Sequence, residues 1–256
     1  MMKRGERVMR IPLYPKRVSP AANLGDGLIQ SGELLVIQHF IPPHSIVFDV
    51  GANVGGWTNA VLEHTAAAAV HLFEPVPDTF QRLVQHLGPK NTEGRLVFMN
   101  VALSDKQDVN VFYHYEHMPV LSTFYRRCGA ENQYGLKPPV AIPVSSTTLD
   151  QYCRSAGIGR VQFLKIDTEG GEFDVLKGAR EWLSHRAIAF IQFEYGGTFA
   201  DAGVTLQEVY GYLQSFGYRI YKIHPDGLEW LPHFLPQYED YQYSNYLAVE
   251  AGISLG

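Results

Sequence analysis

The sequence has few of the residues that would indicate a disulfide-rich, membrane-spanning or nucleic-acid-binding protein. Its two cysteines, Cys128 and Cys153, are too few for a disulfide framework and do not form a close metal-binding pair. No uninterrupted apolar run approaches the roughly 20 residues that cross a bilayer. Lysine and arginine total 21 against 26 acidic residues, so no basic excess favours nucleic acid as a partner.

The chain also lacks a long apolar segment behind its basic start, so a secretory signal is not expected. With so little cysteine, the reducing cytoplasm is the expected location. The 256 residues are 46% hydrophobic, which is enough for one sizeable core. Pro12, Pro15 and Pro20 discourage a helix near the start. We therefore predict an irregular basic arm over residues 1–31 and a single domain over residues 32–256.

Beyond residue 31, short apolar runs that predict strands alternate with segments of helical spacing. The runs that predict the main strands are 46–50, 70–73, 96–99, 161–166 and 187–193. The predicted helices are 33–40, 57–64, 78–87, 167–183 and 206–216. This alternation indicates an α/β fold with a mostly parallel sheet and helices on both faces. Segments 219–223 and 246–249 predict a terminal antiparallel hairpin, and 109–113 and 141–144 predict an inserted or edge element.

In such sheets, ligands bind beyond the carboxyl ends of the strands. Acidic residues stand at or just after four of the predicted strand ends, namely Asp49, Glu74, Asp167 and Glu194. Because parallel strands end at the same edge of the sheet, we expect these carboxylates to lie near one another.

The loop after the first main strand, Asp49 to Gly56, is rich in glycine and suits a nucleotide-type cofactor. Asp49 would repel the pyrophosphate of a dinucleotide at this helix N-terminus, and Asn53 replaces the second glycine of the dinucleotide motif. S-adenosylmethionine carries a sulfonium and an ammonium, both of which carboxylates favour. Glu74, one strand–helix–strand step later, can accept hydrogen bonds from ribose hydroxyls. The residues therefore favour S-adenosylmethionine, with an NAD-dependent oxidoreductase as the alternative.

Five sequence blocks carry a family resemblance. They are VFDVGANVG at 47–55, FEP at 73–75, NVALS at 100–104, TTLD at 147–150 and LKIDTEGGE at 164–172. In this order they resemble the FkbM family of S-adenosylmethionine-dependent methyltransferases, and the block at 164–172 is the most specific. The resemblance implies the class I methyltransferase fold, a Rossmann-like three-layer sandwich with a mostly parallel seven-stranded sheet. It also implies O-methylation of a hydroxyl on a sugar, glycan or secondary metabolite.

The resemblance also implies which residues surround the cofactor. Carried over by position, they are Gly51, Asn53 and Gly55 at the methionine end, Glu74 at the ribose, Val101 and Ala102 at the adenine, and Asp167 near the methionine amine. Asp49 joins this set on the electrostatic argument given above.

Methyl transfer to a hydroxyl needs a base, because an alcohol is a poor nucleophile until its proton is removed. Asp167, Glu169 and Glu172 are the candidate catalytic acids, and Glu169 and Glu172 would share one face of a helix. His117 is the candidate histidine. We expect no metal ligand set, although Asp167 and Glu194 would suit magnesium or calcium and leave a divalent metal as the alternative.

The expected partner is a small-molecule or glycan acceptor, with no nucleic acid and no membrane span. Two aromatic groups, at 113–125 and 230–243, suit either sugar rings and flat metabolites or the contact of a homodimer. A non-catalytic module that binds S-adenosylmethionine and a protein partner is the second alternative.

Overall fold

The computed structural model describes residues 8–9, 25–67, 69–116, 121–127, 131 and 137–255. Nine strands form a large sheet, namely β1 (Val8–Met9), β2 (Ile46–Val50), β3 (Ala69–Phe73), β4 (Leu96–Met99), β8 (Val161–Ile166), β9 (Ile188–Tyr195), β10 (Tyr218–His224), β11 (Gly227–Leu231) and β12 (Ser244–Glu250). Three form a small sheet, namely β5 (Ala102–Leu103), β6 (Asp108–His114) and β7 (Val140–Thr147).

The helices lie between these strands in the chain. They are α1 (Gly25–Gln30), α2 (Glu33–Phe40), α3 (Gly56–His64), α4 (Pro77–Leu87), α6 (Leu149–Ala156), α7 (Glu172–Lys177), α8 (Arg180–Ser184), α9 (Gly197–Ala202) and α10 (Leu206–Ser215). Two short 3-10 helices follow α4 and β11, η1 (Gly88–Lys90) and η3 (Pro236–Tyr238). None of the helices in the described ranges is long and apolar enough to span a membrane.

The order of strands in the large sheet is β1-β11-β10-β12-β9-β8-β2-β3-β4. The five strands from β9 to β4 are parallel to one another, and β12 is antiparallel to both β9 and β10. This order confirms the α/β class I methyltransferase fold. The large sheet has nine strands where seven were expected, because β11 pairs with β10 and β1 pairs with β11. The two strands expected to form a terminal hairpin, β10 and β12, do pair in antiparallel fashion, but β11 lies between them in the chain.

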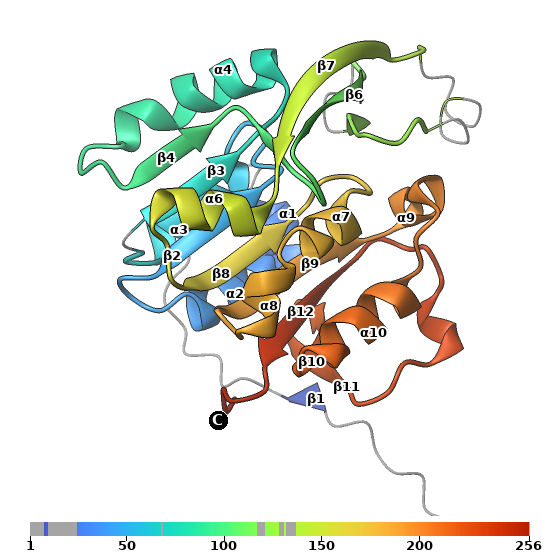
Figure 1. Ribbon diagram of the computed structural model, residues 1–256. Coiled ribbons are helices and arrows are strands. Elements are labelled where there is room, and N and C mark those ends of the chain that lie inside the picture. The colour runs from blue at the N-terminus through green and yellow to red at the C-terminus, as the bar shows by residue number, and fades with distance from the viewer. Residues whose placement is uncertain are drawn as a thin grey trace, which may run out of the picture.

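The parallel strands are buried on both faces, which explains their almost wholly apolar sequences. Val47 and Phe163 point into a core formed with α2, α3 and α4. Their chain neighbours Phe48 and Leu164 point into a second core, formed with α6, α7, α8 and α10. Figure 1 shows the two groups of helices on opposite sides of the sheet, so that the molecule has three layers.

The N-terminal segment is more regular than the sequence predicts. Val8 and Met9 pair with β11, and Gly25–Gln30 forms helix α1 directly before α2. The three prolines that argued against a helix all lie outside the described residues, and α1 begins after them.

The helix predicted over residues 167–183 is instead a loop at 167–171 followed by the two short helices α7 and α8. Gly178 lies between these helices, where an added Cβ atom would come within 2.0 Å of the backbone oxygen of Ser104. Glu169 has a φ of 59° and lies in the loop, whereas Glu172 begins α7. The prediction that Glu169 and Glu172 share one helical face is therefore wrong.

The inserted element predicted at 109–113 and 141–144 is confirmed as the antiparallel pair β6 and β7, to which β5 adds a third strand. In Figure 1 this small sheet lies above α7 and beside α4. Phe112 of β6 packs edge-to-face against Phe124, with ring centroids 4.9 Å apart, and both rings line the cavity described next.

Candidate active site

A cavity of about 370 Å³ lies at the carboxyl ends of β2, β3 and β8. Six residues singled out in the sequence line it, namely Gly51, Asn53, Glu74, Ala102, Asp167 and Glu169. Phe124, from the aromatic group expected at 113–125, lines it too, as do residues that sequence reasoning missed, among them Glu33, Phe112 and Lys165. The strand ends therefore meet at one site, as the alternating pattern predicted.

The loop between β2 and α3 is shaped by close contacts with neighbouring loops. Gly51 has a φ of 79°, and a Cβ atom there would lie 1.8 Å from the backbone oxygen of Asp167. The N–H groups of Gly51 and Ala52 both donate to the carbonyl of Phe73 at 3.0 Å. The glycine thus lets the ends of β2, β3 and β8 approach one another.

Gly55 does not lie at the cavity surface. It has a φ of 86° at the start of α3, and an added Cβ atom would lie 2.5 Å from Cδ1 of Leu87. Its role is to let α3 pack closely against α4, so the expected place at the methionine end is wrong. Asn53, with a φ of 49°, does line the cavity.

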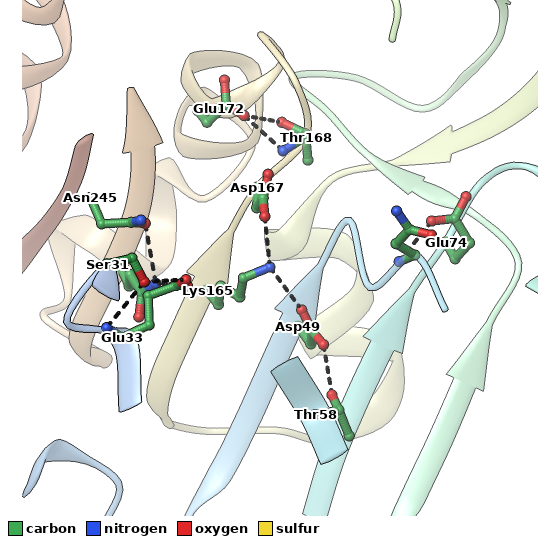
Figure 2. Close-up of polar contacts among 12 residues, drawn as sticks. Ser31, Glu33, Asp49, Thr58, Glu74, Lys165, Asp167, Thr168, Glu172 and Asn245 are labelled. Carbon is green, nitrogen blue, oxygen red and sulfur yellow. Dashed lines mark hydrogen bonds and ion pairs between the residues drawn. The ribbon is translucent and has the colours of Figure 1, made fainter. Parts of the chain in front are cut away.

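Asp49 is also removed from the cavity surface, because its side chain is fully buried beneath the loop. Its Oδ2 accepts a hydrogen bond from Thr58 Oγ1 at 2.6 Å, and its Oδ1 lies 3.5 Å from Lys165 Nζ. Figure 2 shows Lys165 between Asp49 and Asp167, whose Oδ2 lies 3.1 Å from the amine. Asp49 thus balances a buried lysine, which corrects its expected contact with the cofactor.

Lys165 is the central residue that the sequence analysis passed over. Burial by itself would lower its pKa, but the nearby Asp167, Asp49 and Glu33 raise the pKa above its usual value. The amine therefore stays protonated at the cavity wall. A single lysine inside the apolar run of β8 was the available signal, since a charge in a buried strand requires a partner.

Glu74, at the end of β3, is held by backbone donors on both sides. Its Oε2 accepts from the N–H of Asn53 at 3.0 Å, and its Oε1 accepts from the N–H of Val76 at 2.9 Å. Burial raises the pKa of Glu74 to about 7. Each carboxylate oxygen has a second lone pair, so the fixed group can accept two further hydrogen bonds from a ligand.

The wall beyond Glu74 is apolar and is formed by Ala102, Leu103, Phe112 and Phe124. Val101 is absent from this wall and packs on the core that contains α6, so its expected place beside adenine is not confirmed. Phe124 belongs to the aromatic group at 113–125 that the sequence offered as a surface for sugar rings, flat metabolites or a dimer contact.

Glu172 holds the loop after β8 in shape and does not line the cavity. Its Oε1 accepts from the N–H of Thr168 at 2.7 Å, and its Oε2 accepts from the N–H of Gly170 at 2.9 Å. Its side chain is almost fully buried, and burial raises the pKa of Glu172 to about 7. The expectation that Glu172 exchanges a proton with the acceptor is therefore corrected to a role in positioning the loop.

Three other acids gather where β8 and β9 end. One carboxylate oxygen from each of Asp167, Glu169 and Glu194 lies within 4.8 Å of the others. Asp167 is paired with Lys165, and Glu169 is paired with Arg127, a buried residue that the sequence analysis did not single out. Burial raises the pKa of Glu169 to about 7. His117, the candidate histidine, lies outside the described residues.

A known protein family matches the part of the chain that contains the five sequence blocks singled out above, apart from the first two residues of the block at 47–55. Residues 49–220 match the model described as the methyltransferase FkbM domain. The chain belongs to the FkbM methyltransferase family. The matched range contains the glycine loop, Glu74 and the loop at 167–171, and it leaves Glu33 and β12 outside.

Several curated relatives carry methyltransferase names. The 2-O-methyltransferase NoeI of Sinorhizobium fredii is 26% identical over 60% of this chain and 64% of that protein. The hexuronic acid methyltransferase AglP of Haloferax volcanii is 26% identical over 64% of this chain and 62% of that protein. The 31-O-demethyl-FK506 methyltransferase FkbM of Streptomyces tacrolimicus is 28% identical over 70% and 74%. The chain thus spans less than two thirds of NoeI and AglP.

Replacing Glu172 by glutamine should destabilise the protein. The amide can still accept from Thr168, but its NH₂ group then faces the N–H of Gly170, a donor without an acceptor. We expect the free energy of unfolding at pH 8 to fall by about 1–3 kcal/mol. Urea unfolding followed by tryptophan fluorescence measures this, with Glu63→Gln on the exposed side of α3 as the matched control. Equal stability of the two variants would contradict the loop-positioning role.

Proposed function

We propose that this FkbM-family chain is an S-adenosylmethionine-dependent O-methyltransferase that acts on a hydroxyl of a sugar, glycan or secondary metabolite. The observation that carries the proposal is the layout of the cavity. Glu74, with two free lone pairs, lies on one side of Lys165 and Glu33 lies on the other, as Figure 2 shows. Asp167 pairs with Lys165, and a carboxylate oxygen of Glu169 lies within 4.8 Å of one of Asp167. These positions match the ribose diol and the cationic methionine end of the donor.

The charge of the cavity supports this donor over a dinucleotide. Besides Glu74, the acids Asp167, Glu169 and Glu33 stand against Lys165 as the lining cation. An excess of carboxylate attracts a sulfonium and an ammonium and repels a pyrophosphate. The apolar wall at Ala102 and Phe112 suits the adenine ring. The same charge distribution disfavours the NAD-dependent alternative.

The reaction would be an in-line displacement at the methyl carbon. The acceptor oxygen, held about 3 Å from the methyl group, forms the new O–C bond while the C–S bond breaks and its electron pair stays on sulfur. The proton of the hydroxyl passes to a carboxylate. Glu172 is already engaged by backbone donors, so the acids at the ends of β8 and β9 are the available acceptors of this proton. A non-catalytic binding module would not require these acids.

The remaining expectations belong to the same proposal. The names of NoeI, AglP and FkbM include a 2-O-methyltransferase, a hexuronic acid and FK506, which supports a sugar or metabolite hydroxyl as the acceptor. The net charge of −5 supports a role without nucleic acid. We place the activity in the single domain expected over residues 32–256, extended to include α1, because Leu28 of this helix lines the cavity. We place it in the cytoplasm and keep a homodimer open to measurement.

Binding of the donor tests the proposal directly. S-adenosylhomocysteine should bind the purified chain with a dissociation constant of about 1 µM to 1 mM, and NADH should not bind, because the cavity matches the former and repels the pyrophosphate of the latter. Isothermal titration calorimetry measures both. Tight binding of NADH together with no binding of S-adenosylhomocysteine would overturn the assignment.

Asp167→Asn extends this test to catalysis. The variant should lower kcat by about a hundredfold or more, with Asp105→Asn on the surface as its control.

The affinity for S-adenosylhomocysteine should depend on pH through Glu74. Because burial raises the pKa of this acid to about 7, lowering the pH from 8.5 to 6 protonates it and removes acceptors for the ribose hydroxyls. The affinity of the wild type should therefore fall as the pH falls. Glu74→Gln should bind about tenfold more weakly at pH 8.5 and lose the part of the pH dependence that Glu74 contributes. Protonation of Glu169, whose pKa burial also raises to about 7, should still weaken binding of the ammonium group in this variant. Calorimetry across this range measures the effect, and Asp78→Asn, which leaves Glu74 intact, should behave as the wild type.

The reaction should not require a divalent metal. The oxygen ligands of Asp167, Glu169 and Glu194 are of the kind that magnesium or calcium prefers. Lys165 and Arg127 already pair with two of these acids, so their charges are compensated by the protein itself. Dialysis against EDTA should leave kcat/KM for methyl transfer unchanged. Loss of activity that magnesium restores would instead identify the three acids as a metal site.

A further inference from the structure

The cavity at the ends of β2, β3 and β8, where we place S-adenosylmethionine, is called the donor cavity from here on. A second cavity, of about 300 Å³, lies beside it at the ends of β9, β10 and β12. Neither the family nor the relatives' names assign it a role. Its wall includes Ser31, Glu33, Glu194, Tyr243, Ser244 and Asn245. In Figure 2, Ser31, Glu33 and Asn245 lie on the side of Lys165 away from Glu74.

The two cavities meet at acidic residues. Glu33 lines both of them. Glu194 lines the second cavity, and its carboxylate lies within 4.8 Å of those of Asp167 and Glu169, which line the first. A molecule in the second cavity would therefore reach a donor bound in the first on the side of Lys165 away from Glu74, where the methyl group is expected.

We propose that the second cavity binds the acceptor, that this acceptor is a polyhydroxylated, sugar-like molecule, and that Glu194 receives the proton of its methylated hydroxyl. The inference rests on the proposed function and deepens it by locating the acceptor and choosing between the two acceptor classes.

The polar wall favours a sugar over an apolar metabolite. Ser31 donates to Glu33 Oε2 at 2.9 Å, and Gln192 Nε2 donates to Glu33 Oε1 at 2.6 Å. The same Gln192 nitrogen lies 3.3 Å from Asn245 Oδ1, which leaves the NH₂ group of Asn245 to donate to a ligand. An apolar occupant would leave this NH₂ group without a hydrogen-bond acceptor, which is costly once water is excluded.

Tyr243 adds an aromatic surface at the rim of this cavity. Its ring lies directly on the backbone of Gly196, where an added Cβ atom would come within 2.8 Å of Tyr243 Cδ1. The residue is 60% exposed, so the other face of the ring is open. A sugar offers this ring its C–H face while its hydroxyls meet the polar wall.

Glu194 differs from its acidic neighbours in its partners. Lys165 pairs with Asp167 and Arg127 pairs with Glu169, whereas no cation lies within ion-pair distance of Glu194 in the described part of the chain. Burial and the neighbouring acids Asp167, Glu169 and Glu172 raise the pKa of Glu194 to about 10, so Glu194 is protonated at neutral pH while the site is empty. The sulfonium of a donor bound beside it would favour the carboxylate form, which can then receive the proton of the hydroxyl.

The acceptor oxygen gives its proton to the Glu194 carboxylate and forms a bond to the methyl carbon. The C–S bond breaks with its electron pair on sulfur. The products are a methyl ether, neutral S-adenosylhomocysteine and protonated Glu194, which returns its proton to water.

Substitutions at two residues, Asn245 and Glu194, test the inference. The probes are methyl glycosides of common hexopyranoses and, as the competing class, apolar secondary alcohols of steroid and macrolide type, each with S-adenosylmethionine. Methyl transfer should occur to a glycoside. Asn245→Leu should raise the KM of that glycoside by about tenfold or more while the affinity for S-adenosylhomocysteine stays unchanged. Glu194→Gln should lower kcat by about a hundredfold or more, and Glu194→Asp should recover part of it.

The control is Asn59→Leu on α3, outside both cavities, which should leave both constants unchanged. Circular dichroism and S-adenosylhomocysteine binding verify that each variant is folded. The inference is overturned by turnover only on the apolar alcohols, by intact donor binding without turnover on any glycoside, or by wild-type KM in Asn245→Leu and wild-type kcat in Glu194→Gln. Failure of the unmodified chain to bind S-adenosylhomocysteine would instead contradict the proposed function.

Discussion

The buried amine of Lys165, held between Asp49 and Asp167, is the interaction on which the rest of the site depends. A lone buried charge costs on the order of several kcal/mol, whereas one with opposite charges on either side is tolerated. The ion pairs of Lys165 join the end of β2 to the loop after β8. At this point Gly51 allows the backbones of the two segments to come into contact. Because the donor cavity lies directly above this junction, its shape follows from the pairing.

This charge network also separates the acids of the site by role. Asp49 is neutralised below the loop, and Glu172 is turned inward to bind two backbone N–H groups. Both are needed to build the site and neither faces the cavity. Glu74, Glu33 and Glu194 face a cavity, so they are available to a ligand. An acid-rich sequence block therefore contains both structural and ligand-facing carboxylates, which only the three-dimensional arrangement separates.

The sequence predicted the fold and the location of the site well, for physical reasons. The doubly buried strands have unmistakable apolar runs, and parallel strands must bring their following residues to one edge, so Gly51, Asn53, Glu74 and Asp167 were found together. The direction in which a side chain turns was not encoded in such a local pattern. Gly55 was expected at the cofactor from the family resemblance and Asp49 from its charge, but packing against α4 and the pairing with Lys165 remove them from the surface.

The residues that were missed share a different feature, in that their partners are distant in sequence. Glu33 is bound by Gln192, 159 positions away, and Arg127 reaches Glu169 across 42 positions. No periodicity or motif in one segment records such contacts. The two cavities therefore differ in whether their lining residues lie within the sequence blocks that carry the family resemblance. The donor cavity is built mainly from the sequence blocks that carry the family resemblance, which lie within or at the edge of the matched range 49–220. The second cavity is built from α1, α2 and the ends of β9, β10 and β12, and all of its lining residues except Glu194 lie outside the matched range 49–220, so the match to the family leaves its wall undefined.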